Sequence, residues 1–278
     1  MTSDESGENV LVEENEVVQK LWFRRLARKI LPDWVKEKIN ARRSRLRQEK
    51  VLSIVRSELG FSIETLYRRQ PHNHFSYLCD VHGSDKGEVQ ETGHPYPWAS
   101  HTYSDYVSRL FSHCRGQVTK VFECGIGTTD LNLVSNMGSD GSPGASLRVW
   151  RDYFPNAQVL GADIDGNILF TEDRINTFQV DQTDRASIAS MWHEIGGDVD
   201  LMVDDGLHQF YAGKTLFENS IHFLSEYGIY IIEDVQMEDL LKYHRFLSAG
   251  EYFFEIVNLH RKGHALQDNS LIVIRKTL

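Results

Sequence analysis

The feature that most limits the fold is a series of short apolar runs, which begins at residue 118 and alternates with stretches of helical character. Several runs are apolar throughout, as expected of strands that helices cover on both faces. The alternation predicts an α/β fold, namely a doubly wound, Rossmann-like sheet of seven strands that is mostly parallel. The predicted strands are residues 118–125, 157–165, 175–181, 199–206, 228–235, 252–259 and 270–276, and the predicted helices include 146–154, 184–195 and 213–227.

The last two runs are joined by HRKGHALQDN, a connection that is too short and too polar for a helix crossing the sheet. We therefore expect the chain to end in an antiparallel hairpin. His260 and His264, which lie in this connection, are expected to be solvated.

The chain divides by charge and composition. With 278 residues and 41% hydrophobic side chains, it can bury one full-sized core. We expect an acidic, disordered tail at residues 1–19, a basic amphipathic helical extension at 20–75 and one α/β domain at 76–278.

The three cysteines lack metal-binding spacing, and no run reaches the roughly 20 apolar residues that span a bilayer. The acidic start is unlike a signal peptide. These features predict a cytoplasmic protein.

Residues 20–50 are strongly basic. They hold 12 Lys and Arg against three acids, a net charge of +9 in a chain of net charge −10. A helix is predicted here, because apolar side chains repeat every four residues at Trp22, Leu26, Ile30 and Trp34 and so share one face. Pro32 is expected to bend or break this helix. This helix would bind an anionic membrane surface or an acidic partner, or would pack on the chain's own acidic domain or on a second copy. We expect no nucleic-acid partner, because the acidic remainder would repel phosphates.

Ligands of a doubly wound sheet bind at the carboxyl ends of its strands. The first predicted strand ends in ECGIG, where Gly125 and Gly127 permit a tight turn, although the third glycine of a G-x-G-x-x-G motif is missing. The second strand offers Asp163 or Asp165 to a ribose diol, and the third offers Asp181 near an adenine edge. A glycine turn followed by an acid after each of the next two strands predicts a pocket for an adenosyl group.

The fourth predicted strand ends in VDDGLHQ, which contains more than a turn requires. Asp-Asp-Gly alone would serve as the turn, and Asp204 and Asp205 would also suit a helix cap. His208 is the additional group, and a single histidine is more often a hydrogen-bonded structural residue than a base. The motif is therefore interpreted together with the acids that end the fifth strand, Glu233 and Asp234.

These motifs also carry a resemblance to a known family. FECGIG followed by ADID is similar to the S-adenosylmethionine site of class I methyltransferases, in which an acid, here Glu123, precedes the first glycine. The order of five further motifs resembles the metal-dependent sugar O-methyltransferases of the mycinamicin deoxysugar type: GSDKG, HTYSDYVSRLF, SLRVWRDYFPNAQVLGADID, VDDGLHQ and GIYIIEDV. The resemblance begins near residue 76, so it identifies residues 76–278 as the methyltransferase domain and leaves the first 75 residues uncovered.

The resemblance implies that the methyl group of S-adenosylmethionine is transferred to a hydroxyl of a sugar in a nucleotide sugar, a glycan or a glycosylated natural product. It assigns cofactor binding to Glu123, Gly125, Gly127, Asp163 and Asp181. It assigns Mg²⁺ or another divalent cation to Asp205, Glu233 and Asp234, and the role of base to His208. The family's lid over the cofactor resembles the region that holds Lys86, His101, Tyr103 and Tyr106. The chain departs from the family at Leu207, where a small polar residue is usual.

The chemistry of these side chains agrees with the implied roles. If the fourth and fifth strands are neighbours, Asp205 can meet Glu233 and Asp234 although 28 residues separate Asp205 from Glu233. Three carboxylates form a hard oxygen site suited to Mg²⁺. Because a sugar hydroxyl is a poor nucleophile at neutral pH, the metal would lower its pKa and His208 would accept its proton.

Two other functions would use parts of this pattern. A nicotinamide-dependent oxidoreductase shares the sheet, but it needs the third glycine and an acid about 20 residues beyond the turn. Asp163 lies 36 residues beyond Gly127. A membrane-recruited scaffold without catalytic activity would explain residues 20–50 and would leave the acids unexplained. We therefore expect a methyltransferase.

Overall fold

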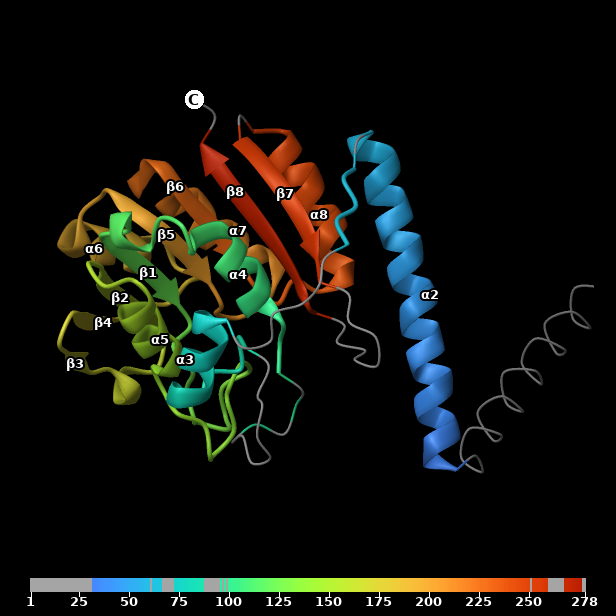
Figure 1. Ribbon diagram of the computed structural model, residues 1–278, viewed down its shortest axis with the longest axis horizontal. Helices are drawn as coiled ribbons and strands as arrows, with labels where there is room; N and C mark the ends of the chain where they lie inside the picture. Colours follow the sequence, from blue (N-terminus) through green and yellow to red (C-terminus); the bar gives the residue numbers. More distant parts are fainter. Residues whose placement is uncertain are drawn as a thin grey trace, which may run out of the picture. The chain divides into compact units, whose positions relative to one another are not determined.

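The protein is described from a computed structural model (Figure 1). The structure describes residues 32–60, 62–66, 73–87, 96, 98, 100–250, 252–259 and 268–276. The chain separates into two compact units, Met1–Lys50 and Val51–Leu278, and each is considered by itself. The predicted acidic tail and several residues named above lie outside the described part: Trp22, Leu26, Ile30, His260 and His264.

Helix α2, Asp33–Leu59, lies within the extension predicted at residues 20–75. Pro32 stands immediately before it, and its carbonyl accepts hydrogen bonds from two amides of the first turn at 2.9 and 3.1 Å. A proline suits a helix start because the first turn leaves its amides without helical partners. In the first unit, Arg45 pairs with Glu49 one turn later on an exposed surface. A surface contact through residues 20–50 stays a prediction.

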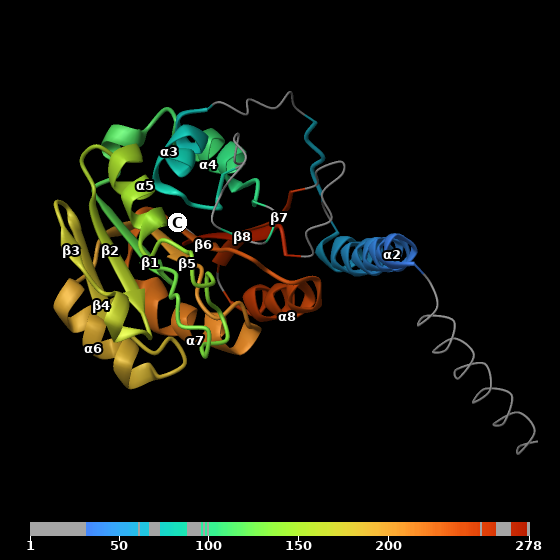
Figure 2. The same ribbon diagram turned by 90° about the horizontal axis from the view of Figure 1, so that it is seen from below.

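The described strands form one sheet in the order β3-β4-β2-β1-β5-β6-β8-β7 (Figures 1 and 2). The strands β4, β2, β1, β5 and β6 are parallel, and the direction of winding reverses between β1 and β5. Such a reversal opens a crevice at the carboxyl ends of the two strands. The bounds are β1 Lys120–Cys124, β2 Gln158–Asp163, β3 Thr171–Glu172, β4 Ile175–Gln179, β5 Val199–Asp204, β6 Leu224–Ile232, β7 Tyr252–Asn258 and β8 Ser270–Lys276.

All seven predicted strands are present, and the predicted C-terminal hairpin is confirmed because β7 and β8 pair antiparallel. β8 also pairs antiparallel with β6, which joins the hairpin to the parallel part of the sheet. The additional strand is β3, two residues that pair back on β4. A segment of this length is too short to show a periodicity in the sequence.

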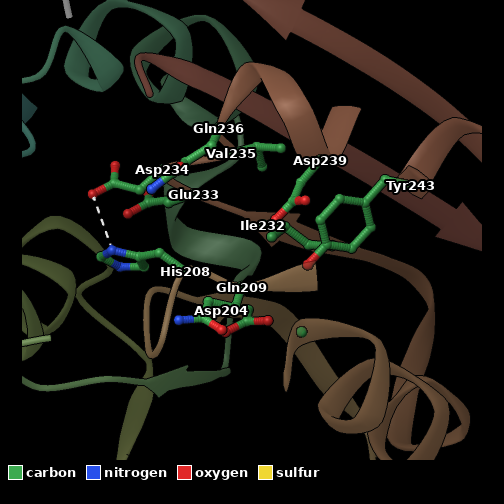
Figure 3. A pocket seen from close by; sticks show the side chains of 11 residues that line it. Asp204, His208, Gln209, Ile232, Glu233, Asp234, Val235, Gln236, Asp239 and Tyr243 are labelled. Atoms are coloured by element: carbon green, nitrogen blue, oxygen red, sulfur yellow. Dashed lines mark ion pairs between the residues drawn. The ribbon is translucent and has the colours of Figure 1, made fainter. Parts of the chain in front are cut away.

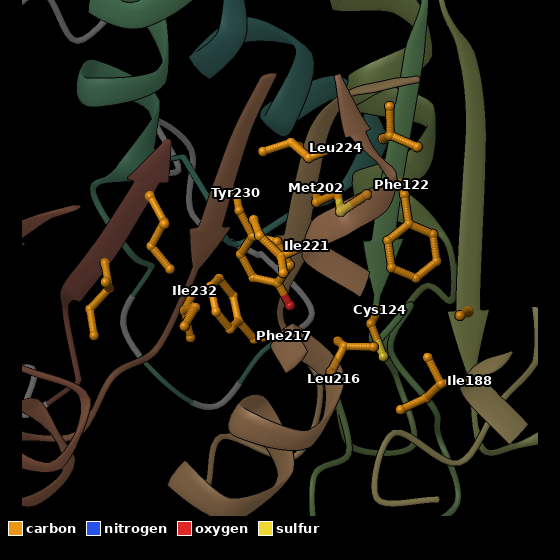
Figure 4. Close-up of a cluster of buried hydrophobic side chains, with 14 of the residues drawn as sticks. Phe122, Cys124, Ile188, Met202, Leu216, Phe217, Ile221, Leu224, Tyr230 and Ile232 are labelled. Carbon is orange, nitrogen blue, oxygen red and sulfur yellow. The ribbon is translucent and has the colours of Figure 1, made fainter. Parts of the chain in front are cut away.

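Helices cover both faces of the sheet (Figure 2). Successive strand residues point to opposite faces, so Val121 of β1 joins one hydrophobic cluster and Phe122 the other. The Val121 cluster includes residues of α3, α4 and α5, and the Phe122 cluster, shown in Figure 4, includes residues of α6, α7 and α8. The helices are α3 His74–His82, α4 Tyr103–Phe111, α5 Ala145–Tyr153, α6 Arg185–Ile195, α7 Phe210–Ser220 and α8 Met237–Ser248, with 3₁₀ turns at Arg115–Gln117, Gly166–Ile168 and Ile221–Phe223.

The helix predicted at residues 213–227 was extended too far. α7 ends at Ser220, a 3₁₀ turn follows, and β6 begins at Leu224. Leu224 pairs with Val199 of β5, and an irregularity then shifts the register so that Leu201 faces Ile229. Leu-Ser-Glu-Tyr carries no strong strand signal, so pairing with β5 overrides the local preference.

None of the described helices is both long enough and apolar enough to cross a membrane. The three cysteines are free thiols, and two of them, Cys79 and Cys124, are buried in the two hydrophobic clusters. Their role is therefore packing within the core.

Trp192 should contribute strongly to stability. It is 1% exposed, its indole N–H donates to the Ser220 hydroxyl at 2.8 Å, and its ring stacks on Phe223. Trp192→Ala should lower the free energy of unfolding by about 3–5 kcal/mol, measured by urea denaturation. The neighbouring His193 is exposed, so His193→Ala should change the free energy of unfolding by less than about 0.5 kcal/mol. Similar losses for the two variants would contradict the packing described for α6.

Candidate active site

The turn after β1 brings two main-chain segments into contact. Gly125 and Gly127 have φ angles of 89° and 88°, which residues with a Cβ rarely adopt. A Cβ on Gly125 would lie 2.1 Å from the carbonyl oxygen of Asp205, in the loop that follows β5. Glycine at position 125 therefore permits both the turn and the approach of the two loops.

Asp163, at the end of β2, fastens this turn. Its Oδ2 accepts a hydrogen bond from the amide of Ile126 at 2.9 Å, and its Oδ1 accepts one from the amide of Asp165 at 3.0 Å. Burial raises the pKa of Asp163, and these amides act in the opposite direction. Asp165 accepts a hydrogen bond from the Thr128 hydroxyl at 2.6 Å, which lowers the pKa of Asp165. The acid predicted to bind ribose thus also has a structural role.

The loop after β4 contributes Gln182, which the sequence did not single out. Asp181, the predicted adenine neighbour, accepts hydrogen bonds from the amide and hydroxyl of Thr183. Gln182 is buried, accepts from the amide of Leu207 at 2.6 Å and donates to Asp204 at 3.2 Å. The only signal in the sequence was a glutamine directly after a predicted strand, and the partners of its side chain lie 22 and 25 residues away.

The predicted neighbours β5 and β6 place their following acids side by side. Asp204 is opposite Ile232 in the parallel register, so Asp205 and Glu233 leave adjacent strands at the same level. Lys86, which comes from the turn after α3, inserts its ammonium group between them. Its Nζ lies 2.6 Å from Asp205 Oδ2, forms an ion pair with Glu233 Oε2, and lies 3.0 Å from Glu123 Oε1.

Lys86, Glu123 and Glu233 are almost completely buried, and Asp205 is partly exposed. Burial alone would lower the pKa of Lys86, but Asp205, Glu123 and Glu233 outweigh it and hold that pKa well above its ordinary value. Burial raises the pKa of both Glu123 and Glu233 despite the nearby ammonium group. For Asp205, burial is outweighed by Lys86 and His208, which hold its pKa below the usual range. One cation therefore compensates only part of the acid cluster.

Glu123 is fully buried beneath the glycine turn. Its Oε2 accepts hydrogen bonds from the Ser146 hydroxyl at 2.7 Å and from the indole N–H of Trp150 at 3.1 Å. The acid predicted from the motif before the first glycine therefore links β1, α5 and the Lys86 turn.

His208 lies between the carboxylates of Asp205 and Asp234, and Figure 3 shows its ion pair with Asp234. Its Nε2 is 3.3 Å from Asp205 Oδ1, and its Nδ1 is 3.8 Å from Asp234 Oδ2. Burial by itself would lower the pKa of His208, but the charges of Asp234 and Asp205 raise it to about 10. The predicted base is therefore held as a cation at neutral pH as long as both carboxylates are ionised and otherwise uncompensated.

Asp234 is held by His101 and by Tyr103, the first residue of α4. The Tyr103 hydroxyl donates to Asp234 Oδ1 at 2.5 Å and accepts from the amide of Asp234 at 3.2 Å. His101 Nδ1 lies 3.5 Å from the same carboxylate and its ring stacks on Tyr103. Lys86, His101 and Tyr103 thus enter the site, whereas the hydroxyl of Tyr106 lies 3.4 Å from Glu255 of β7.

His208 and Asp234 both have left-handed backbone conformations, with φ angles of 55° and 52°. Residues with a Cβ rarely adopt this conformation, and it concentrates at functional sites. The unusual backbone turns both side chains toward each other across the ends of β5 and β6 (Figure 3).

Two groups of possible metal ligands lie next to each other and share Asp205. In each group, one ligand atom from every residue lies within 4.8 Å of the others. The first group is Asp205, His208 and Asp234, and the second is Glu123, Asp205 and Glu233. The predicted ligands Asp205, Glu233 and Asp234 are thus distributed over both groups. Glu233 Oε1 is buried and lacks a hydrogen-bond partner.

Comparisons with known proteins find sugar O-methyltransferases among the similar sequences. The chain is 32% identical over 155 residues to the 8-demethyl-8-α-L-rhamnosyl tetracenomycin-C 2'-O-methyltransferase of Streptomyces olivaceus, covering 56% of this chain and 36% of that protein. It is 30% identical over 135 residues to the mycinamicin VI 2''-O-methyltransferase of Micromonospora griseorubida, covering 49% and 32%. The chain therefore spans about a third of the length of these curated relatives. No family model matches it.

Solved structures give the decisive comparison for the fold. The MycE methyltransferase from the mycinamycin biosynthetic pathway, in complex with Mg and SAH, matches with a TM-score of 0.52 and 22% identity, covering 73% of this chain and 55% of that protein. The chain has the class I methyltransferase fold. In this fold, the glycine turn, Asp163 and the acids after β5 and β6 all lie at the carboxyl ends of neighbouring parallel strands. The methyltransferase fold predicted from the sequence is confirmed.

Gly125→Ala should destabilise the methyltransferase fold by more than backbone strain alone. Gly83 is the matched control, because it is in the left-handed region, with φ 75° and ψ 36°, and no atom lies within 4 Å of where its Cβ would be. Gly83→Ala should therefore cost only the left-handed strain, about 1–2 kcal/mol. Gly125→Ala adds a clash with the main chain of Asp205 and should cost about 1–3 kcal/mol more, measured by urea denaturation. Equal losses would show that the two loops move apart freely.

Proposed function

We propose that the chain is an S-adenosylmethionine-dependent and divalent-metal-dependent O-methyltransferase that acts on a hydroxyl of a sugar. The observation that carries this proposal is the convergence of His208 with Asp205, Glu233 and Asp234 beside the glycine turn of a methyltransferase fold. The names of the similar proteins, which are O-methyltransferases of sugar-bearing compounds, support the choice of acceptor. A glycosylated natural product is accordingly the first acceptor class to test.

The methyl donor would bind across the ends of β1, β2 and β4. Gly125 and Gly127 let its chain approach the backbone, and Asp163 has lone pairs left for the ribose hydroxyls after accepting two amides. Asp181 would lie near the adenine edge. Glu123, being fully buried, would act from beneath the turn through its ion pair with Lys86.

The residues present fit a divalent cation. The donor set is made of hard carboxylate oxygens, and the buried Glu233 Oε1 is a polar atom that lacks a partner. Asp205, Glu233 and Asp234 would hold the ion, with His208 beside them. When bound, the ion would supply Lewis acidity that lowers the pKa of the acceptor hydroxyl.

His208 would accept the proton of the acceptor hydroxyl. Asp234 and Asp205 are what raise its pKa to about 10, so a cation held by these carboxylates would lower that pKa and leave the imidazole free to accept a proton. With Nε2–H donated to Asp205, Nδ1 keeps a lone pair for the proton. The hydroxyl oxygen then attacks the methyl carbon, and the electron pair of the broken bond leaves with the sulfur.

Asp163→Ala should weaken the binding of S-adenosylhomocysteine by roughly 30-fold, which corresponds to about 2 kcal/mol for a lost charge-assisted hydrogen bond. Isothermal titration calorimetry measures the dissociation constant. The variant also leaves the amides of Ile126 and Asp165 without their acceptor, so circular dichroism must first show that it is folded at the titration temperature. Asp165→Ala is the comparison. Wild-type affinity in both variants would contradict the cofactor site.

Removing the metal should separate turnover from cofactor binding. EDTA should abolish methyl transfer to a rhamnosylated or other deoxysugar-bearing acceptor, added Mg²⁺ should restore it, and S-adenosylhomocysteine should still bind. His208→Ala should lower the rate by about 10²–10⁴ with the metal content unchanged, because only the base is removed. Asp205→Ala should lose both metal and activity.

The exposed His193→Ala on α6 is the control for these variants and should keep the wild-type rate. Mass spectrometry of the acceptor reports the transferred methyl group, and metal analysis reports the bound ion. Full activity of metal-free His208→Ala protein would overturn the proposed mechanism.

A further inference from the structure

Lys86 reaches the acid cluster from a turn whose position is fixed by its main chain. The carbonyl of Asp85 accepts from the amide of His101 at 2.8 Å, and the carbonyl of Lys86 accepts from the amide of Ser104 at 3.1 Å. The carboxylate of Asp85 accepts from the indole N–H of Trp98 at 2.8 Å. The lysine side chain therefore reaches the carboxyl ends of the central strands from a backbone that these hydrogen bonds hold in place.

Its ammonium group meets acids from three strands. Glu123 belongs to β1, Asp205 follows β5 and Glu233 follows β6. Oxygens of these acids lie within 4.8 Å of one another, a spacing suited to holding a divalent cation. Lys86 Nζ lies 2.6 Å from Asp205 and 3.0 Å from Glu123, and it pairs with Glu233. The ammonium group thus takes the place that such a cation would occupy.

All three acids have one oxygen bound by Lys86 and one outside that contact, and the second oxygen of Glu123 accepts from Ser146 and Trp150. Asp205 Oδ2 binds the ammonium group, whereas Asp205 Oδ1 lies 3.3 Å from His208. Glu233 Oε2 binds the ammonium group, whereas Glu233 Oε1 is buried without a hydrogen-bond partner. The lysine therefore leaves one oxygen of Asp205 and one of Glu233 for the neighbouring group that contains Asp234.

Charge explains why a single ammonium group suits this place. Buried carboxylates this close together cannot all stay ionised without a cation. Two divalent ions here would place four positive charges beside a cationic methyl donor, whereas one ion and one ammonium group place three. Repulsion between charges is strongest in a buried site, so the smaller charge favours binding of the donor.

We propose that Lys86 is a built-in cation that occupies the place of a second divalent ion, limits the site to one metal, and positions Asp205 and Glu233 by one oxygen each. The limit to one metal rests on the proposed function, and the position of the ammonium group does not. Lys86 is accordingly a positioning residue for the acids at the ends of β5 and β6.

Mn²⁺ alone is the probe, counted by electron paramagnetic resonance of the free ion during titration of the full chain. The wild-type chain should bind one Mn²⁺ and Lys86→Ala should bind two, because three acids are left without their cation. Adding Glu123→Gln to Lys86→Ala should return the count to one. Glu123 belongs only to the second group of possible ligands, the one whose oxygens contact Lys86. A purely structural role of Lys86 would not raise the count.

The outcomes separate this proposal from the proposed function. If the wild-type chain binds no Mn²⁺ and Lys86→Ala binds one, the role of Lys86 holds and the metal-dependent mechanism fails. If Lys86→Ala binds the same number as wild type, the role of Lys86 is overturned. Lys86→Gln, which keeps most of the volume and loses the charge, serves as the second variant. If both variants unfold without metal, Mn²⁺ should restore their folding, and circular dichroism that does not respond to Mn²⁺ would equally overturn the proposal.

Discussion

Buried negative charge at the carboxyl edge of the sheet is the constraint on which the rest of the site depends. The parallel pairing of β5 with β1 and β6 brings Asp205 and Glu233 to the same edge as Glu123, and Asp234 follows directly. Acids in such a position repel one another and lose their hydration. Compensation comes from outside the sheet, through the ammonium group of Lys86 and the hydroxyl of Tyr103. The segments around α3 and α4 are therefore part of the site rather than a separate cover.

The same edge holds unfavourable backbone conformations. His208 and Asp234 have left-handed φ angles, which cost on the order of 1–2 kcal/mol for each residue with a Cβ. Gln182 holds the amide next to His208, and Tyr103 holds the amide of Asp234. Hydrogen bonds from two other parts of the chain thus oppose the relaxation of each strained residue. This arrangement fixes the histidine relative to the carboxylates before any ligand binds, as the proposed role of a base requires.

The sequence predicted those features that depend on local pattern. Apolar runs located all seven longer strands, and the parallel arrangement was enough to bring Asp205 next to Glu233 across 28 residues. The predicted helix was wrong at Leu224, where pairing with Val199 of β5 makes the chain a strand. The sequence also assigned Asp163 only to the cofactor, because hydrogen bonds from the amide of Ile126 leave no trace in residue type.

The contact of Lys86 with Asp205 shows most clearly where sequence reasoning ends. The two residues are 119 positions apart, and Lys86 lies outside the strands whose order fixes the edge. A lysine in a Gly-Ser-Asp-Lys-Gly turn has the composition of an exposed loop. Hydrogen bonds that hold this turn to residues 98, 101 and 104 direct the side chain inward.

The positive charges of Lys86 and His208 differ in how strongly each depends on the surrounding carboxylates. The three acids around Lys86 hold its pKa well above neutrality, so its charge does not change near neutral pH. The pKa of His208, about 10, depends on Asp234 and Asp205, and it falls when these acids are compensated by something other than the imidazole. Arrival of a divalent cation at these carboxylates would thus be accompanied by release of the histidine proton, whereas Lys86 keeps its proton and its contacts. Under the proposed function, a base would become available only in the molecule that has bound its metal, and Lys86 would keep the acids in position through that change.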